Sequence, residues 1–450
     1  MRALVVFLLV MAATGVVASP RLVSGPMPGY VSARTASIWM QADQPGEAQL
    51  EYWRADLPAQ RQRSGQYPLR VEDDYIARID LAGLEPGARY EYRLLLDGQT
   101  ADVDAPLAFR TQPLWRWRSE PPDFRVFLAS CTYLNDPPFD RPGRPWGDGY
   151  GVFETMAARA RSDSGYHFML WLGDSVYFRE ADFDSPWGMA YRWWTHRRVP
   201  ELQSLLHATR HHGIWDDHDY GPNDSNRSFP FKGAALELFQ RYWANPSYGL
   251  PETPGIFTTF SFLDADVFLL DDRWYRSADR IVGDPDKTML GRAQLDWLKQ
   301  ALTASTAKFK FIANGSQMLN DANRFEGWQN FKTEREGFVD WLTRQGVTGV
   351  VLLSGDRHHT ELLKRDRPGS YPLYELTCSP LTAGPRDADD ERDNPLRVPG
   401  TLTIGQRNFC TLEVAGQRAD RKLVFRAFST DGRELWSQEV RAESLKPPGK

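Results

Sequence analysis

The chain has 450 residues, of which 41% are hydrophobic and 25% charged, and its formal net charge is −5. This composition is that of a globular protein with a large core, which excludes a mainly disordered or fibrous chain. Proteins that bind DNA or RNA usually present a basic surface, so the negative charge predicts no nucleic-acid-binding surface.

The N-terminus has the pattern of an export signal. Arg2 precedes an apolar run over residues 3–11, and the small residues at 16–18 provide a cleavage site. The run is too short to cross a bilayer, and no later stretch is long and apolar enough, so we expect no stable membrane span. We predict a signal peptide at residues 1–18 and a secreted or periplasmic protein. A membrane anchor that stays uncleaved is the alternative.

Residues 20–112 are predicted to form an all-β domain. Hydrophobic and polar residues alternate over 36–40 and 48–52, as in half-buried strands. The segment 84–92 combines a Pro-Gly turn with Tyr90, a pattern similar to the tyrosine corner of immunoglobulin-like and fibronectin-like sandwiches. A simple hairpin is the alternative to this sandwich.

After a Pro-containing connector at 113–122, the pattern changes to alternating strands and helices. Apolar strands are predicted at 124–130, 167–172, 213–215, 257–263, 266–271, 309–313 and 349–353. Helices are predicted at 151–161, 187–207 with a break at Pro200, 231–243, 291–303 and 332–344. Residues 408–440 are predicted to form two or three antiparallel strands. This order predicts an α/β domain with parallel strand pairing at residues 123–442.

Three cysteines are present: Cys131, Cys378 and Cys410. An odd number in an oxidising compartment favours one disulfide and one remaining thiol. Cys378 and Cys410 are plausible partners because both lie in the C-terminal part, which would leave Cys131 as the free thiol.

Four polar motifs each follow a predicted strand, at the sheet edge where open α/β sheets place their ligands. They are Ser130-Cys131-Thr132-Tyr133, Gly173-Asp174-Ser175-Val176-Tyr177, Trp215-Asp216-Asp217-His218-Asp219 and Ser354-Gly355-Asp356-Arg357-His358-His359. Each motif alone is typical of a solvated turn or a buried small residue. Together they bring anionic groups to one place, and such groups repel one another unless cations lie between them.

This convergence predicts a metal site. A mixture of carboxylate, imidazole, phenolate and thiolate ligands favours a transition metal, and the surplus carboxylates suit a harder ion such as calcium. Two metals can clamp a phosphate ester and lower the pKa of a bridging water, so that a metal-activated hydroxide attacks. Asp174 is the candidate for the carboxylate that both ions share. His218 could donate a hydrogen bond to the phosphate or protonate the leaving group.

The four motifs together resemble those of the PhoD-like alkaline phosphatases, which belong to the calcineurin-like metallophosphatases. The resemblance covers roughly residues 20–440 and implies a metallophosphatase αββα sandwich preceded by an immunoglobulin/fibronectin-like domain. It also implies a ferric ion, Fe(3+), held by Cys131, Asp174, Tyr177 and His358. Calcium, Ca(2+), would be held by Asp174, Asp217 and Asp356, with Asp174 bridging the two ions.

The resemblance further implies that His218 contacts substrate, and Asn223 and Arg273 are additional candidates for substrate binding. The predicted function is that of a secreted metallophosphatase that hydrolyses phosphate monoesters, diesters or both. Its substrate would be a small-molecule, lipid or nucleotide phosphate ester. The alternatives are a secreted binding protein with a degenerate metallophosphatase scaffold and a phospholipase-type diesterase. No feature of the sequence indicates an oligomeric state.

The segment 182–198 is rich in aromatic residues and arginine. Two interpretations remain open for it. It could form a wall or lid over the cleft that attracts phosphate, or a helix packed on the core with a charged outer face.

Overall fold

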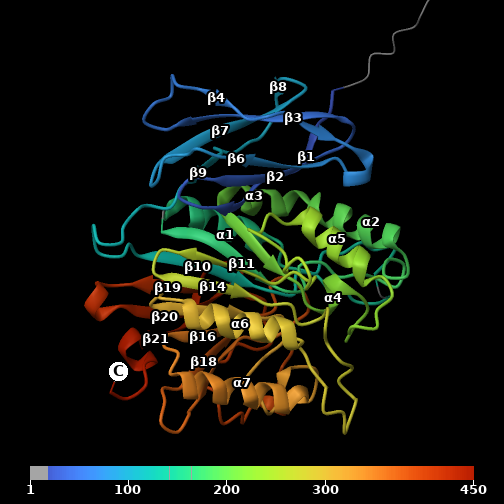
Figure 1. Cartoon of the computed structure of the whole chain (residues 1–450). Coiled ribbons are helices and arrows are strands. Elements are labelled where there is room, and N and C mark those ends of the chain that lie inside the picture. Colours follow the sequence, from blue (N-terminus) through green and yellow to red (C-terminus); the bar gives the residue numbers. More distant parts are fainter. Residues whose placement is uncertain (1–18, 141, 164, 450) are drawn as a thin grey trace, which may run out of the picture.

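The structure is a computed structural model that describes residues 19–140, 142–163 and 165–449. The predicted signal peptide at residues 1–18 lies outside the described residues. An all-β part, coloured blue in Figure 1, lies against a larger part of mixed sheets and helices. Within the described part of the chain, none of the helices combines the length and the apolar character that a bilayer span requires.

The all-β part consists of two antiparallel sheets with a small core of their own. One sheet contains β1 (Leu22–Val31), β2 (Ala36–Ala42) and β6 (Ile76–Leu81). The other contains β3 (Gly46–Arg54), β4 (Gln62–Arg63), β5 (Tyr67–Leu69), β7 (Arg89–Leu96), β8 (Gln99–Thr100) and β9 (Ala108–Arg110). Tyr90, Tyr92 and Leu94 are buried on one face of β7, because successive side chains of a strand point to opposite faces.

A tyrosine corner is present at the start of β7. The hydroxyl of Tyr90 accepts a hydrogen bond from the backbone N–H of Glu85 at 2.9 Å. The Tyr90 ring also stacks on Phe109 of β9, with the ring centroids 5.5 Å apart. This contact favours the predicted sandwich over a simple hairpin.

Two six-stranded mixed sheets form the larger part of the described chain. The first has the order β12 (Arg210–Ile214), β11 (Tyr166–Leu172), β10 (Phe124–Ala129), β19 (Asn408–Ala415), β20 (Lys422–Ser429), β21 (Glu434–Arg441). The second has the order β13 (Thr258–Phe262), β14 (Ala265–Leu269), β15 (Phe309–Ala313), β16 (Val350–Ser354), β18 (Leu373–Thr377), β17 (Glu361–Arg365). Strands β10–β12 pair in parallel, as do β14, β15, β16 and β18, so their carboxyl ends share one edge in each sheet.

Helices lie outside the two sheets (Figure 1). Those nearest the first sheet are α1 (Gly151–Ser162), α2 (Pro186–Arg197), α3 (Pro200–Ala208) and α5 (Lys232–Tyr242). Those beside the second sheet are α6 (Arg292–Ala304) and α7 (Lys332–Gln345). One-turn helix α4 is Asp217–Tyr220, and 3₁₀ turns cover Val71–Asp73, Trp328–Phe331, Asp389–Glu391, Arg418–Asp420 and Ala442–Leu445.

The all-β part packs closely on the larger part. The backbone N–H of Tyr30 in β1 donates to the carbonyl of Ala244 at 2.9 Å. Gly29 is required beside this contact, since a Cβ there would lie 2.3 Å from the Cβ of Ala244. Trp39 of β2 belongs to the large core and lies under the guanidinium of Arg197. The sandwich is therefore docked by specific contacts.

The predicted disulfide is confirmed, because Cys378 and Cys410 are bonded to each other. The bond joins the segment after β18 in the second sheet to β19 in the first. Cys131 is a free, fully buried thiol.

Most predicted helices and strands are confirmed within a few residues of their expected ends, and Pro200 starts α3 as expected. Two strands, β17 and β18, were not predicted, and the Asp-Asp-His-Asp motif expected in a loop forms α4. A capping box explains this helix: the Asp216 side chain accepts from the backbone of Asp219, whose own side chain accepts from the N–H of Asp216.

The aromatic and basic segment 182–198 forms α2 and packs on the core. Arg192 is buried and pairs with Asp136 and Asp182, and Arg197 is buried against three tryptophan rings. These guanidinium groups hold the helix in place, so the structure favours the core-packed interpretation over a phosphate-attracting lid.

Candidate metal centre

The four polar motifs meet at the carboxyl ends of strands from both sheets. Cys131 follows β10, Asp174 follows β11 and Asp217 follows β12, three parallel neighbours of the first sheet. His358 follows β16 of the second sheet. Residues that are more than 200 positions apart in the sequence therefore lie together where the two sheets face each other.

Cys131, Asp174, Tyr177 and His358 converge on one point. The phenol oxygen of Tyr177 lies 3.0 Å from Asp174 Oδ2 and 3.3 Å from His358 Nε2. The Sγ of Cys131 lies 3.6 Å from the same Asp174 oxygen. Ligands that are each about 2.0–2.3 Å from one ion lie about 3–4 Å from one another, so these spacings match the edges of a coordination shell.

The backbone at this point is held in an unusual conformation. Cys131, Asp174, Asp356 and His358 have φ angles of 56°, 51°, 65° and 55°, in the left-handed region that residues other than glycine seldom occupy. Each such residue costs on the order of 1–3 kcal/mol and persists where the surrounding structure enforces it, as often happens at functional sites. The strain directs the side chains of separate loops toward a common centre.

Glycines allow the loops to approach one another. A Cβ at Gly173, whose φ is 85°, would lie 2.6 Å from the Cβ of Asp216. A Cβ at Gly355 would lie 2.4 Å from the carbonyl oxygen of Leu172 and 2.5 Å from the Cβ of Ser130. The Gly-Asp pairs of the second and fourth motifs are thus needed for close packing of four strand ends.

The electrostatics of the cluster favour added positive charge. Burial raises the pKa of Asp174 well above its usual range, and the nearby Asp217 and Cys131 raise it further. Burial likewise raises the pKa of Cys131 to about 11 and that of Tyr177 well above 10. A cation among these groups would reverse the shifts, because it favours the ionised ligands that the protein alone disfavours.

A second group of possible ligands adjoins the first through Asp174. Ligand atoms of Asp174, Asp217 and His218 all lie within 4.8 Å of one another. Asp217 Oδ2 also accepts the backbone N–H of Asp224 at 2.8 Å. Within the described residues Asp356 belongs to neither group, although its buried Oδ2 has no hydrogen-bond partner and its backbone oxygen lies 3.5 Å from Cys131 Sγ.

The donor set fits the two predicted ions. One thiolate, one phenolate, one imidazole and a carboxylate suit Fe³⁺, and the carboxylate oxygens of Asp174 and Asp217 suit a harder ion. Cys131, Asp174, Tyr177 and His358 would hold the first ion. Asp174 and Asp217 would hold the second, with Asp356 as the additional oxygen donor.

His218 is positioned by both groups. Its ring stacks on Tyr177 with the centroids 4.3 Å apart, and its backbone N–H donates to Asp174 Oδ1 at 3.3 Å. The side chain is 20% exposed. Asp219 ties the loops together, because its carboxylate accepts from the N–H and the hydroxyl of Ser175 at 3.1 and 2.9 Å.

The position of Arg273 contradicts its predicted substrate contact. Its guanidinium is completely buried and donates to Asp216, Glu326, Ser316 and the carbonyl of Ser225. These acceptors engage every N–H of the group, so Arg273 positions the loops around the centre. Asn223 is exposed, one residue before the Asp224 amide that binds Asp217, and its role stays a prediction.

Glu326 is a site residue that the sequence did not reveal. One of its carboxylate oxygens lies within 4.8 Å of ligand atoms of both Asp216 and Asp217. It follows no strand and belongs to no recognisable motif, so it can be identified as a site residue only from the structure. Burial alone would raise its pKa, but Arg273 and Arg276 outweigh that effect and lower it to about 2.

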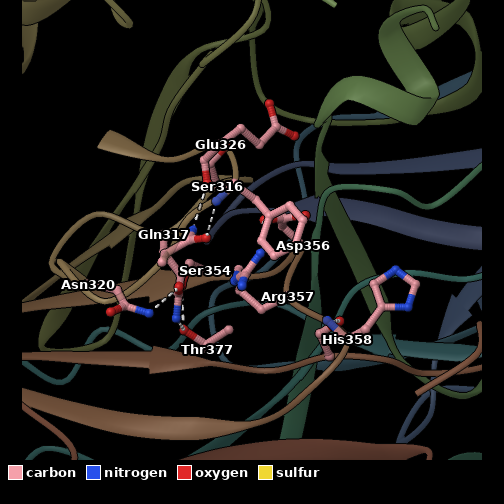
Figure 2. A network of polar contacts seen from close by, with 12 residues as sticks. Ser316, Gln317, Asn320, Glu326, Ser354, Asp356, Arg357, His358 and Thr377 are labelled. Carbon is pink, nitrogen blue, oxygen red and sulfur yellow. Dashed lines mark hydrogen bonds and ion pairs between the residues drawn. The ribbon is translucent and has the colours of Figure 1, made fainter. Parts of the chain in front are cut away.

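A buried network of amide and hydroxyl groups supports the strand end that carries His358 (Figure 2). Gln317 Nε2 donates to Thr377 Oγ1 at 2.9 Å, and Asn320 Nδ2 donates to Gln317 Oε1 at 2.9 Å. The hydroxyl groups of Ser354 and Thr377 are 2.9 Å apart. Figure 2 shows the His358 side chain directed away from this network, which therefore fixes the backbone and leaves the imidazole to the centre.

Comparison with known protein families agrees with this geometry. A model of the PhoD-like phosphatases matches residues 127–408, which is more than half of the chain. The chain belongs to the PhoD-like phosphatase family. A model described as a domain of unknown function (DUF7800) matches residues 19–113, the region of the sandwich.

Known relatives show how far the likeness extends. Alkaline phosphatase D of Bacillus subtilis (strain 168) is 24% identical over 376 residues, which cover 70% of this chain and 59% of that relative. The match therefore spans less than two thirds of the curated relative.

Solved structures share the fold. A structure of PhoD has a TM-score of 0.70 and 16% identity, and the match covers 94% of this chain and 92% of that one. The purple acid phosphatase PPD1 from yellow lupin (Lupinus luteus) seeds has a TM-score of 0.63 and 11% identity, with 94% and 74% covered. The predicted metallophosphatase fold with an all-β domain before it is confirmed.

Proposed function

We propose that this PhoD-like phosphatase is a metal-dependent enzyme that hydrolyses phosphate esters. The observation that carries the proposal is the convergence of Cys131, Asp174, Tyr177 and His358 within coordination distance of one point. Family membership supports a phosphatase, and the donor set supports Fe(3+) with Ca(2+) as the metals. When bound, the ions would supply Lewis acidity toward the phosphate and lower the pKa of a coordinated water.

Three residues would have separate roles in this reaction. Asp174 would hold both ions at a fixed separation, since its carboxylate belongs to both ligand groups. His218, partly exposed and stacked on Tyr177, would hydrogen-bond the phosphate or give a proton to the leaving oxygen. Cys131 would be a ligand and not a nucleophile, because it is fully buried among the other ligands.

We also propose that the protein is secreted or periplasmic after removal of residues 1–18, with domains at 20–112 and 123–442. The Cys378–Cys410 disulfide supports an oxidising compartment. Substrates would be small-molecule, lipid or nucleotide phosphate esters, whether monoesters, diesters or both.

Metal analysis of the purified protein tests the proposal. We expect about one iron per chain together with calcium, visible absorption from the iron–ligand bonds, and turnover of 4-nitrophenyl phosphate or its bis ester. Cys131→Ala should lose the iron, the colour and the turnover together. The control is the double variant Cys378→Ala/Cys410→Ala, which tests whether removal of any cysteine causes the same losses. A colourless protein without metal or turnover would instead support the binding-protein alternative.

A further inference from the structure

Trp146 is an exposed aromatic side chain beside the metal centre. It is 46% exposed, and its ring centroid lies 5.6 Å from that of His358 with an angle of 45° between the planes. A single exposed aromatic residue is ordinary on a protein surface. This ring differs because it contacts a candidate metal ligand and its loop is fixed by hydrogen bonds.

Backbone hydrogen bonds fix the loop that carries the ring. The N–H of Asp148 donates to the carbonyl of Thr382 at 3.0 Å. Arg407 bridges the same two segments, because its guanidinium donates to the carbonyls of Trp146 at 3.0 Å and of Thr382 at 2.8 Å. On the other side, Gly147 and Asn135 exchange hydrogen bonds at 2.9 and 2.7 Å. The ring is thus preorganised, and little conformational entropy would be lost when a ligand packs on it.

Gly384 joins Trp146 to the metal centre. A Cβ at this position would lie 2.9 Å from the Trp146 ring, so only glycine permits the observed contact. The carbonyl of Gly384 accepts a hydrogen bond from Nδ1 of His358, which leaves Nε2 of that imidazole directed at Tyr177. The residue that sets the orientation of His358 therefore also forms the support of the indole.

A second half-exposed ring belongs to the same region. Phe325, the neighbour of Glu326, is 48% exposed, and the guanidinium carbons of Arg386 and Arg357 lie 4.4 and 5.1 Å from its centroid. The backbone N–H of Arg386 donates to the carbonyl of His358 at 2.9 Å. Flat apolar surface therefore adjoins the strand end that carries His358, which suits an ester with an aromatic group.

We propose that the Trp146 ring is a stacking surface that makes the centre prefer phosphate esters whose leaving group carries an aromatic ring. This inference rests on the proposed phosphoesterase function and names the substrate class for it. Trp146 takes no part in bond breaking; it would orient the ester so that the phosphate reaches the centre.

The test compares benzyl phosphate with cyclohexylmethyl phosphate, two monoesters with similar size and similar leaving-group acidity. The wild-type protein should have a kcat/KM at least about five-fold higher for benzyl phosphate, the value expected of one aromatic contact. In Trp146→Leu the ratio of the two kcat/KM values should fall about five-fold, through KM for the benzyl ester and not through kcat. Trp146→Phe, which retains a ring, should keep most of the preference.

The matched control is Trp117→Leu, which removes a 90% exposed tryptophan in the connector, at the opposite edge of the sheets. This variant should keep the wild-type ratio. Should Trp146→Leu fold poorly, benzylphosphonate and cyclohexylmethylphosphonate are compared as inhibitors of the wild-type protein, and equal inhibition constants would refute the stacking role. Turnover of both esters with no preference overturns this inference alone, whereas turnover of no phosphate ester overturns the proposed function as well.

Discussion

Two groups of buried acidic side chains lie next to each other at the strand ends, and only one of them shares a buried arginine. Asp216 and Glu326 share the guanidinium of Arg273, which holds the pKa of Glu326 low in spite of its burial. Asp174 is equally buried, but Cys131 and Tyr177 are its neighbours and its pKa is raised. Beside this guanidinium Glu326 is ionised, although burial still raises the pKa of Asp216 above its usual range. Asp174 has no such partner, and an added cation would favour its ionised form.

The Arg273 group therefore has a structural role, whereas the Asp174 group is suited to bind metal. An arginine fills all its hydrogen bonds within the protein and leaves no position for a ligand, as Arg273 does here. A metal ion retains open positions when protein ligands do not complete its shell. The Arg273 group should therefore respond to mutation in stability, and the Asp174 group in metal content and turnover.

Replacing Asp174 should have the largest effect on function. In Asp174→Asn both ligand groups lose their shared carboxylate, so we expect loss of both metals and at least about a 1000-fold fall in kcat/KM. In the chelator-treated protein the same change should raise the unfolding midpoint, because it removes a buried acid with a raised pKa. Metal analysis, kinetics and thermal unfolding check these outcomes. Retention of iron and turnover would contradict the assignment of Asp174.

Replacing Arg273 should affect stability most. Arg273→Met leaves Asp216 and Glu326 without their shared cation, and we expect a loss of about 3–5 kcal/mol in the free energy of unfolding. Denaturant titration of the variant and the wild type measures this loss. The control is Arg292→Met on the exposed face of α6, which should change stability by less than about 0.5 kcal/mol. Equal effects from both variants would mean that the buried arginine is not needed for charge balance.

Replacing His218 should separate turnover from metal binding. His218→Ala removes the partly exposed imidazole but keeps the backbone N–H that donates to Asp174. We expect about a 100-fold fall in kcat with the metal content unchanged. If the imidazole protonates the leaving oxygen, the fall should be larger for benzyl phosphate than for 4-nitrophenyl phosphate, whose leaving group needs no proton. A loss of metal in this variant would place His218 among the ligands.

The sequence predicted the strand ends of the centre better than it predicted the groups that support them. The strand at 309–313 has the expected bounds, and the motifs at Cys131, Asp174 and His358 meet as expected, because parallel strands expose their carboxyl ends at one edge. Glu326 and Trp146 lie in loops that carry no periodic pattern, so their places depend on tertiary packing. Arg273 was noticed, but its partners are 53 and 57 positions away, and sequence spacing could not reveal that they occupy the whole guanidinium.

The smallest expected effect is a pH dependence that only the metal-free protein shows. Burial raises the pKa of Asp217 to about 6 and that of Asp356 to about 7, with Glu326 contributing to both shifts. The unfolded chain titrates these carboxyls near pH 4, so the folded state binds their protons more tightly. This contribution to stability is complete below about pH 4 and is lost as the pH rises through 6 and 7. The unfolding midpoint of chelator-treated protein should therefore fall by several degrees between pH 5 and pH 8, relative to Asp356→Asn treated in the same way. Protein that retains its metals should show no such fall, since the cations keep both carboxylates ionised. If the metal-free wild type and the metal-free variant show the same change of midpoint with pH, the raised pKa of Asp356 is contradicted.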